Sequence, residues 1–530
     1  MKMKITGHLV LLLIIAIALS ACAANEVTTP GSSPDAGAGS VAPAVDEGGE
    51  KVLRIRFYDD PAGFDPATVF RVENEAIAFN VFSGLTTYDS ETGEILPDLA
   101  ESWETSDNVT WTFNLREGVQ WQKGYGEFTS ADVVYTYERI MAPDTASPYA
   151  TDLANVKSLT APDEYTVVYE LHQADANFLH VVANYHQGQI VKQEAVEEHG
   201  EQFRWNPVGT GPYELESIST NSEIVLTRHE DYYKGPAPIA KLQFIIIKDE
   251  ETATIALQNG EVDIAMRINR DEALARLERD GFSMNARMDR SISVKVFNTS
   301  EPPFDDVRVR QAWAHAVDYA SIYETLQPYL AQGTTNILPS WMDGYSEEVP
   351  VYAYDPERAK ELLAEAGYPD GFTVTQPLVA SNGVREAEQL EQEYLQAVGI
   401  QLEFELVDAP VFNQRRNSGE FQLSSRALPA INPDTILFSY LHPDNIAPRG
   451  LNGARYDNPE LTKKLEAARA EVDAEARAEL YKEVQQIALA DLAYLPTQSL
   501  HGYWPSQPYV VGVHLNPLSK VNFYEVDIQN

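Results

Sequence analysis

Hydrophobic and polar positions alternate along several short segments of the chain, as they do in β-strands. Residues 51–57 alternate apolar and charged side chains, which predicts a strand with one buried face. Residues 224–227 predict a further strand. Residues 242–247 are apolar almost throughout, which is typical of a central strand buried on both faces.

Other segments repeat their apolar residues with the period of an α-helix. The clearest helix is capped by Asp355, carries Pro356 in its first turn and ends at Gly367. A second helix is predicted to begin at Asn458, and a third is predicted over 474–493. Strands and helices alternate irregularly, so the predicted fold class is α/β (mixed α+β), built from several sheets.

One apolar run stands apart at the N-terminus. Lys2 and Lys4 precede the apolar residues 9–19, and Leu-Ser-Ala-Cys22 follows. The run is shorter than the about 20 residues that a membrane-spanning helix needs, and the pattern is that of a secretory signal. The last four residues resemble a bacterial lipobox, which predicts a lipoprotein signal over 1–22 and a lipid on Cys22. This is the only cysteine in the chain.

Residues 23–51 are rich in Gly, Ala, Ser, Pro and acids and poor in large apolar side chains. Such a composition cannot bury a core, so this stretch is predicted to be a flexible linker. A flexible chain of this length reaches about 30 Å, which suits a tether between a membrane and a folded body.

Size and charge narrow the class of protein further. Residues 52–530 are too many for a single hydrophobic core and imply two or three domains. The formal net charge of −41 argues against nucleic acid as a partner, because nucleic-acid binding needs basic patches. The charge does not by itself predict the charge of a ligand.

The motifs of common enzymes are missing. The sequence has no Gly-x-Ser-x-Gly elbow, no His-Glu-x-x-His, no phosphate loop and no paired His/Cys metal spacing. Gly209-Thr-Gly-Pro-Tyr213 lacks the lysine of a phosphate cradle and predicts a turn. We therefore expect no catalytic residues, no metal site and no cofactor.

A series of short phrases, in a fixed order, resembles one family of proteins. The phrases include Leu96-Pro-Asp-Leu-Ala-Glu-Ser-Trp103 and Asn298-Thr-Ser-Glu-Pro-Pro-Phe304, and the others lie at 64–66, 82–85, 111–119, 128–133, 209–213, 257–265 and 306–312. Together with the helix after Asp355, they resemble the peptide/opine/nickel-binding family of solute-binding proteins of ATP-binding cassette (ABC) importers. The resemblance runs from about residue 52 to about 515.

The resemblance implies a two-lobed, periplasmic-binding-protein-like clamshell with an additional inserted domain. Lobe I would be discontinuous, over 52–92, 205–291 and 495–530, with domain II, 93–204, inserted in it and lobe III over 292–494. Ligand would bind between lobes that close by hinge bending.

Peptide-binding members carry in the third domain a tryptophan followed within a few residues by an aspartate, whose carboxylate accepts the ammonium of the ligand. The matching stretch here, 421–434, has no tryptophan and no acid before Asp434. Depending on register, the anchor position falls on Ala430, Ile431 or Asn432. Free peptides would then bind less tightly, and neutral or anionic solutes become more plausible.

Further ligand-binding candidates follow from the resemblance and from side-chain chemistry. Arginines could clamp an anionic group, and aromatic or amide side chains could stack on or bond to a sugar. The candidates are Arg71, Val72, Asn74 and Glu75 in the first lobe, Tyr149 in the inserted domain, Trp341, Arg416 and Arg426 in the third, and Gln498, His501, Tyr503 and Trp504 near the C-terminus.

These patterns imply an extracytoplasmic, lipid-anchored solute-binding protein of an ABC importer. It would capture a peptide or peptide-like solute, deliver it to the permease and ATPase subunits, act as a monomer and not be an enzyme. An oligosaccharide or other non-peptide receptor is the alternative within this class. A secreted hydrolase and a clamshell used as a sensor or adhesin are the alternatives of another class.

Overall fold

The structure, a computed structural model, describes residues 44–45, 48–69, 72–183, 188–516 and 519–529. All the described residues belong to one compact unit. The predicted signal over 1–22, its Cys22, most of the predicted linker, and Arg71 lie outside the described residues.

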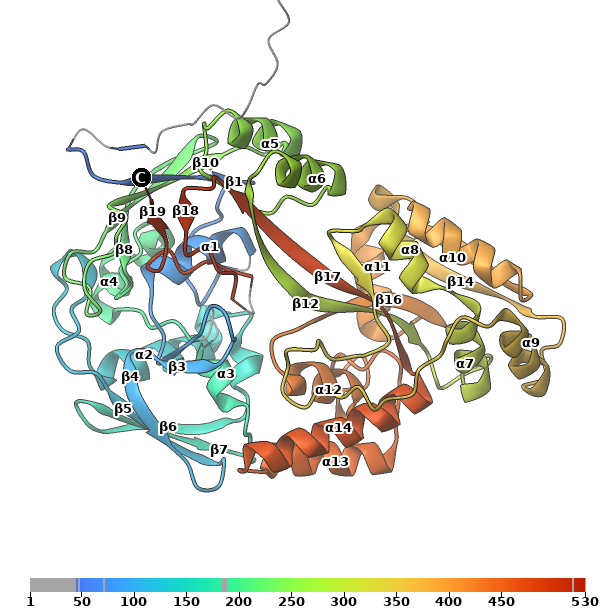
Figure 1. Ribbon diagram of the computed structural model, residues 1–530. Helices are drawn as coiled ribbons and strands as arrows, with labels where there is room; N and C mark the ends of the chain where they lie inside the picture. Colours follow the sequence, from blue (N-terminus) through green and yellow to red (C-terminus); the bar gives the residue numbers. More distant parts are fainter. Residues whose placement is uncertain (1–43, 46–47, 70–71, 184–187, 517–518, 530) are drawn as a thin grey trace, which may run out of the picture. The chain divides into compact units, whose positions relative to one another are not determined.

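The largest sheet joins segments from the beginning, middle and end of the chain (Figure 1). Its order is β16-β12-β17-β11-β1-β10-β9-β8, with β13 paired to β17. The strands are β1 (Val52–Phe57), β8 (Tyr213–Ser219), β9 (Glu223–Arg228), β10 (Lys241–Ile246), β11 (Ile264–Ala265), β12 (Ser283–Phe297), β13 (Ala331–Gly333), β16 (Leu423–Pro429) and β17 (Tyr494–Ser506).

Strand β1 forms as predicted, but the prediction of one buried face is wrong. Leu53, Ile55 and Phe57 are fully buried on one face. On the other face Arg54 makes a bidentate ion pair with buried Asp263, at 2.6 and 3.1 Å. Arg56 is 2% exposed and donates to backbone carbonyls, including those of Ile247 and Met266. The strand is central and parallel to β10 and β11, so its charged residues need partners inside the protein.

Four smaller sheets complete the β-structure. The four-stranded sheet has the order β4 (Ala100–Glu104), β5 (Thr110–Leu115), β7 (Thr166–Leu171), β6 (Val156–Asp163). The two-stranded sheets are β2 (Thr86–Tyr88) with β3 (Ile95–Pro97), β14 (Phe372–Val379) with β15 (Ile400–Val407), and β18 (Val510–Val511) with β19 (Asp527–Ile528). The mixed α/β fold class is confirmed.

The predicted helices begin where their capping residues stand. Asp355 accepts a hydrogen bond from the backbone N–H of Arg358 and caps α9 (Pro356–Glu365), and Gly367 follows with a φ of 92°. Asn458 caps α13 (Pro459–Ala470) through two backbone N–H groups. Helix α14 (Ala474–Asp491) ends two residues before the predicted end, at Leu492 in the left-handed region.

The remaining α-helices are α1 (Val72–Val81), α2 (Ser130–Met141), α3 (Phe178–Ala183), α4 (Gln193–His199), α5 (Glu250–Gln258), α6 (Asp271–Arg279), α7 (Val307–Ala316), α8 (Tyr319–Leu326), α10 (Glu386–Gln396), α11 (Ala409–Ser418) and α12 (Pro433–Leu441). Residues 210–212, where a turn was predicted, form a bend. Both glycines are needed for a close backbone approach, since a Cβ at Gly209 or Gly211 would meet the backbone of Val81 at under 3 Å.

The hydrophobic cores fall into groups that β12 and β17 connect. The largest core takes residues from 53–266 and 504–528, and two others take residues from 292–495. The groups also touch directly: the N–H of Ala176 donates to the carbonyl of Arg469 at 3.0 Å, and Asn177 donates to Tyr481 at 3.1 Å.

The predicted domain boundaries stay a prediction. Over the described ranges, no helix has the length and apolar character needed to cross a membrane.

Candidate ligand-binding site

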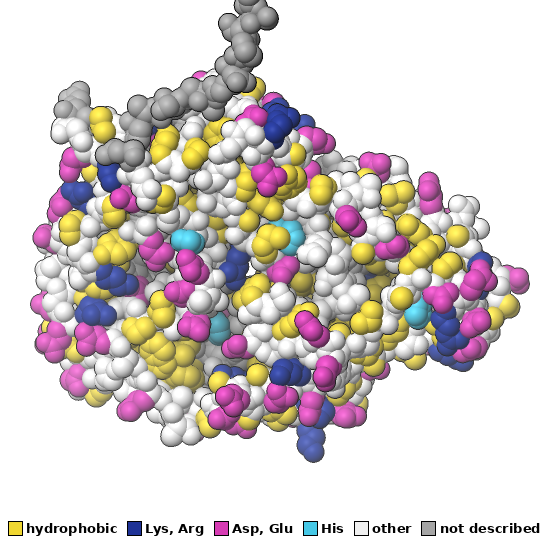
Figure 2. All heavy atoms as spheres, in the orientation of Figure 1, with side chains coloured by type: hydrophobic (Ala, Val, Ile, Leu, Met, Phe, Trp, Pro, Cys, Tyr) yellow, Lys and Arg dark blue, Asp and Glu magenta, His cyan; other side chains and the backbone are white. Residues whose placement is uncertain are grey.

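A charged cavity of about 560 Å³ lies along β12, β16 and β17. We call it the arginine cavity because its lining includes Arg267, Arg290, Arg385 and Arg426 together with Lys295. Glu388 and Glu391 are its only acidic lining residues within the described part of the chain. An excess of basic groups is notable in a chain of charge −41, whose acidic side chains are scattered over the face in Figure 2.

Two of these basic groups are neutralised by the two acids. Lys295 Nζ lies 2.6 Å from Glu391 Oε2, and both side chains are almost completely buried. Tyr319 donates to the other oxygen of Glu391 at 2.6 Å, so this carboxylate is fully engaged. Arg385 pairs with Glu388 in the first turn of α10. Both acids of the lining are thus paired with basic groups, and Arg267, Arg290 and Arg426 have no carboxylate partner in the described lining.

Arg267 and Arg290 both line the cavity, and among the described residues neither has a carboxylate partner. Burial lowers the pKa of Arg290, and the positive charge of Arg267 lowers it further. Arg290 Nε donates to the carbonyl of His501 at 3.3 Å, but no ion pair with Arg267 or Arg290 is recorded there. Gln498, 8% exposed, also lines this cavity, and its Oε1 has no hydrogen-bond partner. The cavity therefore offers positive charge and an unused acceptor.

A β-bulge sets the directions of these side chains. Arg287 pairs with Gly502 and Ser291 with Leu500, so residues 288–290 lie opposite His501 alone. Asp289 takes a φ of 53° within the bulge. Bulges redirect side chains. Arg290, within the bulge, lines the arginine cavity, whereas Arg287, just before it, stacks on Trp341.

A second cavity, of about 250 Å³, lies between residues 92–95 and 176–180 on one side and 341–343 and 431–433 on the other. We call it the Trp341 cavity; its lining includes Trp341, Ile431, Asn432, Asn177 and Arg477. The Oδ1 of Asn432 caps α12 by accepting from the backbone N–H of Thr435 at 2.8 Å, so this oxygen is already engaged within the fold.

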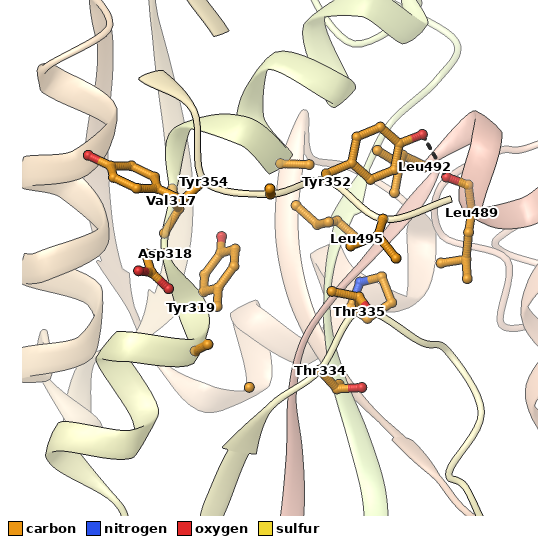
Figure 3. A pocket seen from close by; sticks show the side chains of 16 residues that line it. Val317, Asp318, Tyr319, Thr334, Thr335, Tyr352, Tyr354, Leu489, Leu492 and Leu495 are labelled. Atoms are coloured by element: carbon orange, nitrogen blue, oxygen red, sulfur yellow. Dashed lines mark hydrogen bonds between the residues drawn. The ribbon is translucent and has the colours of Figure 1, made fainter. Parts of the chain in front are cut away.

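A third cavity, of about 220 Å³, is mostly apolar (Figure 3). Its walls include Tyr319, Tyr352, Leu489 and Leu495, and Tyr352 donates to the carbonyl of Leu489 at 3.1 Å. It contains none of the residues predicted to bind ligand, and all its lining residues fall between 314 and 496. We therefore place the candidate site in the other two cavities.

Comparison with known proteins identifies the family. Residues 94–447 match the model of the bacterial extracellular solute-binding proteins, family 5 middle region. The chain belongs to this family. This family 5 protein is 30% identical to heme-binding protein A of Haemophilus influenzae over 506 aligned residues. The alignment covers 88% of this chain and 90% of that protein.

Solved structures of similar proteins share the fold. HbpA2 from Haemophilus parasuis is 26% identical, with a TM-score of 0.84 over 91% of this chain and 100% of the other. The periplasmic binding protein DppA from Helicobacter pylori in complex with peptide STSA is 26% identical, with a TM-score of 0.74 over 90% and 98%. The family 5 chain thus has the α/β fold of the two-lobed periplasmic binding proteins.

Of the candidates in the first lobe and the inserted domain, those that the structure describes, Asn74, Glu75 and Tyr149, line neither cavity. Arg71 and the side chain of Val72 are outside what the structure describes. Asn74 is buried and accepts from the N–H of Ala62, and Glu75 makes a buried ion pair with Lys520 at 2.9 Å. Tyr149 is 6% exposed and donates to the carbonyl of Val69.

The third-lobe and C-terminal candidates divide between cavities and core. Arg426, Gln498 and His501 line the arginine cavity, and Trp341, Ile431 and Asn432 line the Trp341 cavity. Arg416 lies near Arg426: burial, then the charge of Arg426, lowers its pKa, and its Nε has no partner. The structure places Ala430, Tyr503 and Trp504 in hydrophobic cores.

The sequence analysis missed the residues that give the site its charge. These are Arg267, Arg290, Lys295 and Arg385 in the arginine cavity, and Arg287, which stacks on Trp341. No local motif marks them, because they come from one loop, one bulged strand and the N-cap of one helix, which meet only in the fold. No cluster of three or more potential metal ligands (His, Cys, Asp, Glu) occurs in the described part of the chain.

Proposed function

We propose that this family 5 protein captures a peptide or peptide-like solute between its lobes and delivers it to the permease and ATPase of an ABC importer. The observation that carries the proposal is the arginine cavity in a chain of this family. Its lining comes from 267–290 and 497–501 as well as from 293–295 and 323–427, so a ligand there would touch segments assigned to both lobes.

The lining favours a solute that carries a carboxylate. Peptides and heme, the ligands in the names of two similar proteins, both carry carboxylates. Arg267, Arg290 and Arg426 could bind such a group by donating charge-assisted hydrogen bonds to its oxygens. The proposal also has the protein act as a monomer. It would release the solute chemically unchanged and would need no cofactor and no nucleic acid.

The proposal includes an extracytoplasmic location with a lipid anchor on Cys22. Its support is the lipobox-like Leu-Ser-Ala-Cys after an apolar run. Intact-mass analysis of protein from the membrane fraction should show removal of residues 1–21 and a diacylglyceryl adduct. Cys22→Ala should abolish the adduct; an unmodified parent protein in the soluble fraction contradicts the anchor.

An oligosaccharide or other non-peptide solute is the second candidate. The expected ammonium anchor falls on Ala430, Ile431 or Asn432, and none of these residues is acidic. This favours the second candidate, because a zwitterionic peptide would leave its ammonium unpaired there.

Isothermal titration calorimetry separates these candidates. The purified chain is titrated with the dipeptide Ala-Phe and with cellotriose and xylotriose, and small-angle scattering follows lobe closure. Binding of Ala-Phe with a decrease in radius of gyration supports the peptide receptor, and closure by a trisaccharide supports the alternative. Recovery of a chemically altered solute contradicts a pure binding role.

A further inference from the structure

Arg287 presents a buried positive charge with unused hydrogen-bond donors. It is 7% exposed, and its Nε and Nη2 have no acceptor among the described residues. Its pKa is lowered by burial, which the charge of nearby Asp289 opposes. Most buried polar groups in folded proteins are hydrogen-bonded, so two unused donors on one buried cation need a partner.

Trp341 adds a third unused donor at the same place. The guanidinium carbon of Arg287 lies 4.2 Å from the centre of the Trp341 ring, and the buried indole Nε1 has no partner. Stacking on the indole fixes the guanidinium plane without using its N–H groups. All three unused atoms are donors, so the missing partner must be an acceptor.

The ring under Arg287 belongs to the cavity where the resemblance predicts the acidic anchor of peptide receptors. Trp341 lines the Trp341 cavity together with Ile431 and Asn432, two of the three positions on which the expected ammonium anchor falls. The backbone connects the two sites closely, because the N–H of Ala430 donates to the carbonyl of Arg290, in the same bulge as Arg287. Where the resemblance leads us to expect an acid, this chain has an apolar residue and a nearby buried cation.

We propose that an oxyanion of the bound solute, a carboxylate in the simplest case, binds Arg287 beside Trp341. The inference rests on the proposed function and specifies its solute class. The charge of the anchor is inverted relative to peptide receptors, so recognition depends on a ligand carboxylate and not on a free ammonium. Suitable solutes are acidic molecules, including peptides whose amino group is blocked.

Three probes test the inference by calorimetry on the whole purified protein. N-acetyl-Ala-Phe has a carboxylate and no ammonium, Ala-Phe amide has an ammonium and no carboxylate, and cellotriose has neither. We expect binding of N-acetyl-Ala-Phe only. Arg287→Gln should weaken it about 10- to 100-fold, the loss of a hydrogen-bonded charged contact, and Arg287→Lys should weaken it less.

Arg310 offers a matched control. It is 6% exposed and burial lowers its pKa, as for Arg287, but it donates to the carbonyls of Asp491 and Phe304 at 2.7 and 2.5 Å. Arg310→Gln should lower the Tm and leave the affinity of folded protein unchanged. Arg287→Gln should lower the affinity and leave the Tm of the free protein unchanged or higher.

The outcomes separate the anchor from the receptor function. Equal binding of Ala-Phe amide or cellotriose by the parent and by Arg287→Gln overturns the anchor and keeps the receptor. Binding of N-acetyl-Ala-Phe through Arg287 without closure in small-angle scattering keeps the anion site and overturns the receptor. Two further results overturn the anchor. One is a Tm loss for Arg287→Gln as large as that for Arg310→Gln. The other is that the parent protein binds none of N-acetyl-Ala-Phe, succinate and citrate at millimolar concentration.

Discussion

Arg287 and Arg469, 182 residues apart in sequence, both stack on aromatic rings, but among the described residues only Arg469 pairs with a carboxylate. Arg469 lies 3.5 Å from the ring centre of Phe438, and Arg287 lies 4.2 Å from that of Trp341. Asp434 binds Arg469 through three contacts of 2.7–3.1 Å. Arg287 keeps two N–H-bearing nitrogens without an acceptor.

This difference in partners distinguishes Arg469, which makes a structural contact, from Arg287, which is the proposed binding position. The carbonyl of Arg469 also accepts from Ala176, so this arginine joins two parts of the fold. Burial lowers and the hydrogen bonds to Asp434 raise its pKa, with a net rise, whereas the pKa of Arg287 is lowered. A satisfied buried cation stabilises the protein as folded, and an unsatisfied one is stabilised by what binds to it.

Removing the carboxylate from the satisfied arginine should have the largest effect. Asp434→Ala leaves Arg469 partly buried and unpaired, and we expect a loss of about 3 kcal/mol in the free energy of unfolding, measured in urea. Glu483→Ala is the control: it breaks the Lys464–Glu483 pair, whose acid is half exposed, and should cost under about 1 kcal/mol. Equal losses would contradict the distinction.

Giving the unsatisfied arginine an acidic neighbour should change ligand preference. Ile431→Asp adds a carboxylate to the Trp341 cavity, which should repel an oxyanion and attract an ammonium. We expect N-acetyl-Ala-Phe to bind about tenfold more weakly and Ala-Phe to gain relative to it, by calorimetry. Ile431→Asn, with similar shape and no charge, is the control. The same change in both variants argues against a charge effect.

Asp175 links pH to the region around Arg469. Burial, then the charge of Asp434, raises its pKa, opposed by Arg469 and by the N–H of Asn177. A raised pKa means that the folded state holds the proton more tightly, so this stability is complete below about pH 4 and lost as pH rises through the raised pKa.

Asp175→Asn should therefore be more stable than the parent at pH 7, with a difference that vanishes towards pH 4, in urea unfolding. Asp107→Asn should behave in the opposite way. Backbone N–H groups of Thr110 and Val109 lower the pKa of Asp107, so its contribution is lost as pH falls. Parallel pH profiles for the two variants would refute this assignment.

The smallest effect concerns the ring under Arg287. Trp341→Phe keeps an aromatic ring and removes an N–H without a partner, so unfolding free energy should change by under about 1 kcal/mol. Trp313→Phe is the matched control, because Trp313 Nε1 donates to Tyr319 at 3.1 Å and should cost about 1 kcal/mol more. A larger loss for Trp341→Phe indicates an internal acceptor for its N–H.

Part of the candidate site could be predicted from the sequence. Which residues were predicted depends on whether the resemblance or the side-chain chemistry was used. Position in the resemblance led to Ile431 and Asn432, and side-chain chemistry led to Trp341, Gln498 and Arg426; all five line a cavity. The first-lobe candidates Asn74 and Glu75 followed from the same resemblance but are bonded inside the fold.

The sequence by itself determined the features whose causes are local. Asp355 and Asn458 cap helices because a side-chain oxygen needs only the N–H groups two or three residues away. The apolar strands and the ordered family phrases likewise require no knowledge of distant partners.

Only the tertiary structure decided which charges are satisfied. Asp263 pairs with Arg54 across 209 residues, and Glu391 pairs with Lys295 across 96 residues. Arg287, beside the β-bulge, stacks on the indole of Trp341 and has no carboxylate partner among the described residues. The sequence shows that each of these residues is charged. Whether a charge stabilises the fold or waits for a ligand depends on burial and on partners that are remote along the chain, because desolvation and Coulomb attraction act through space.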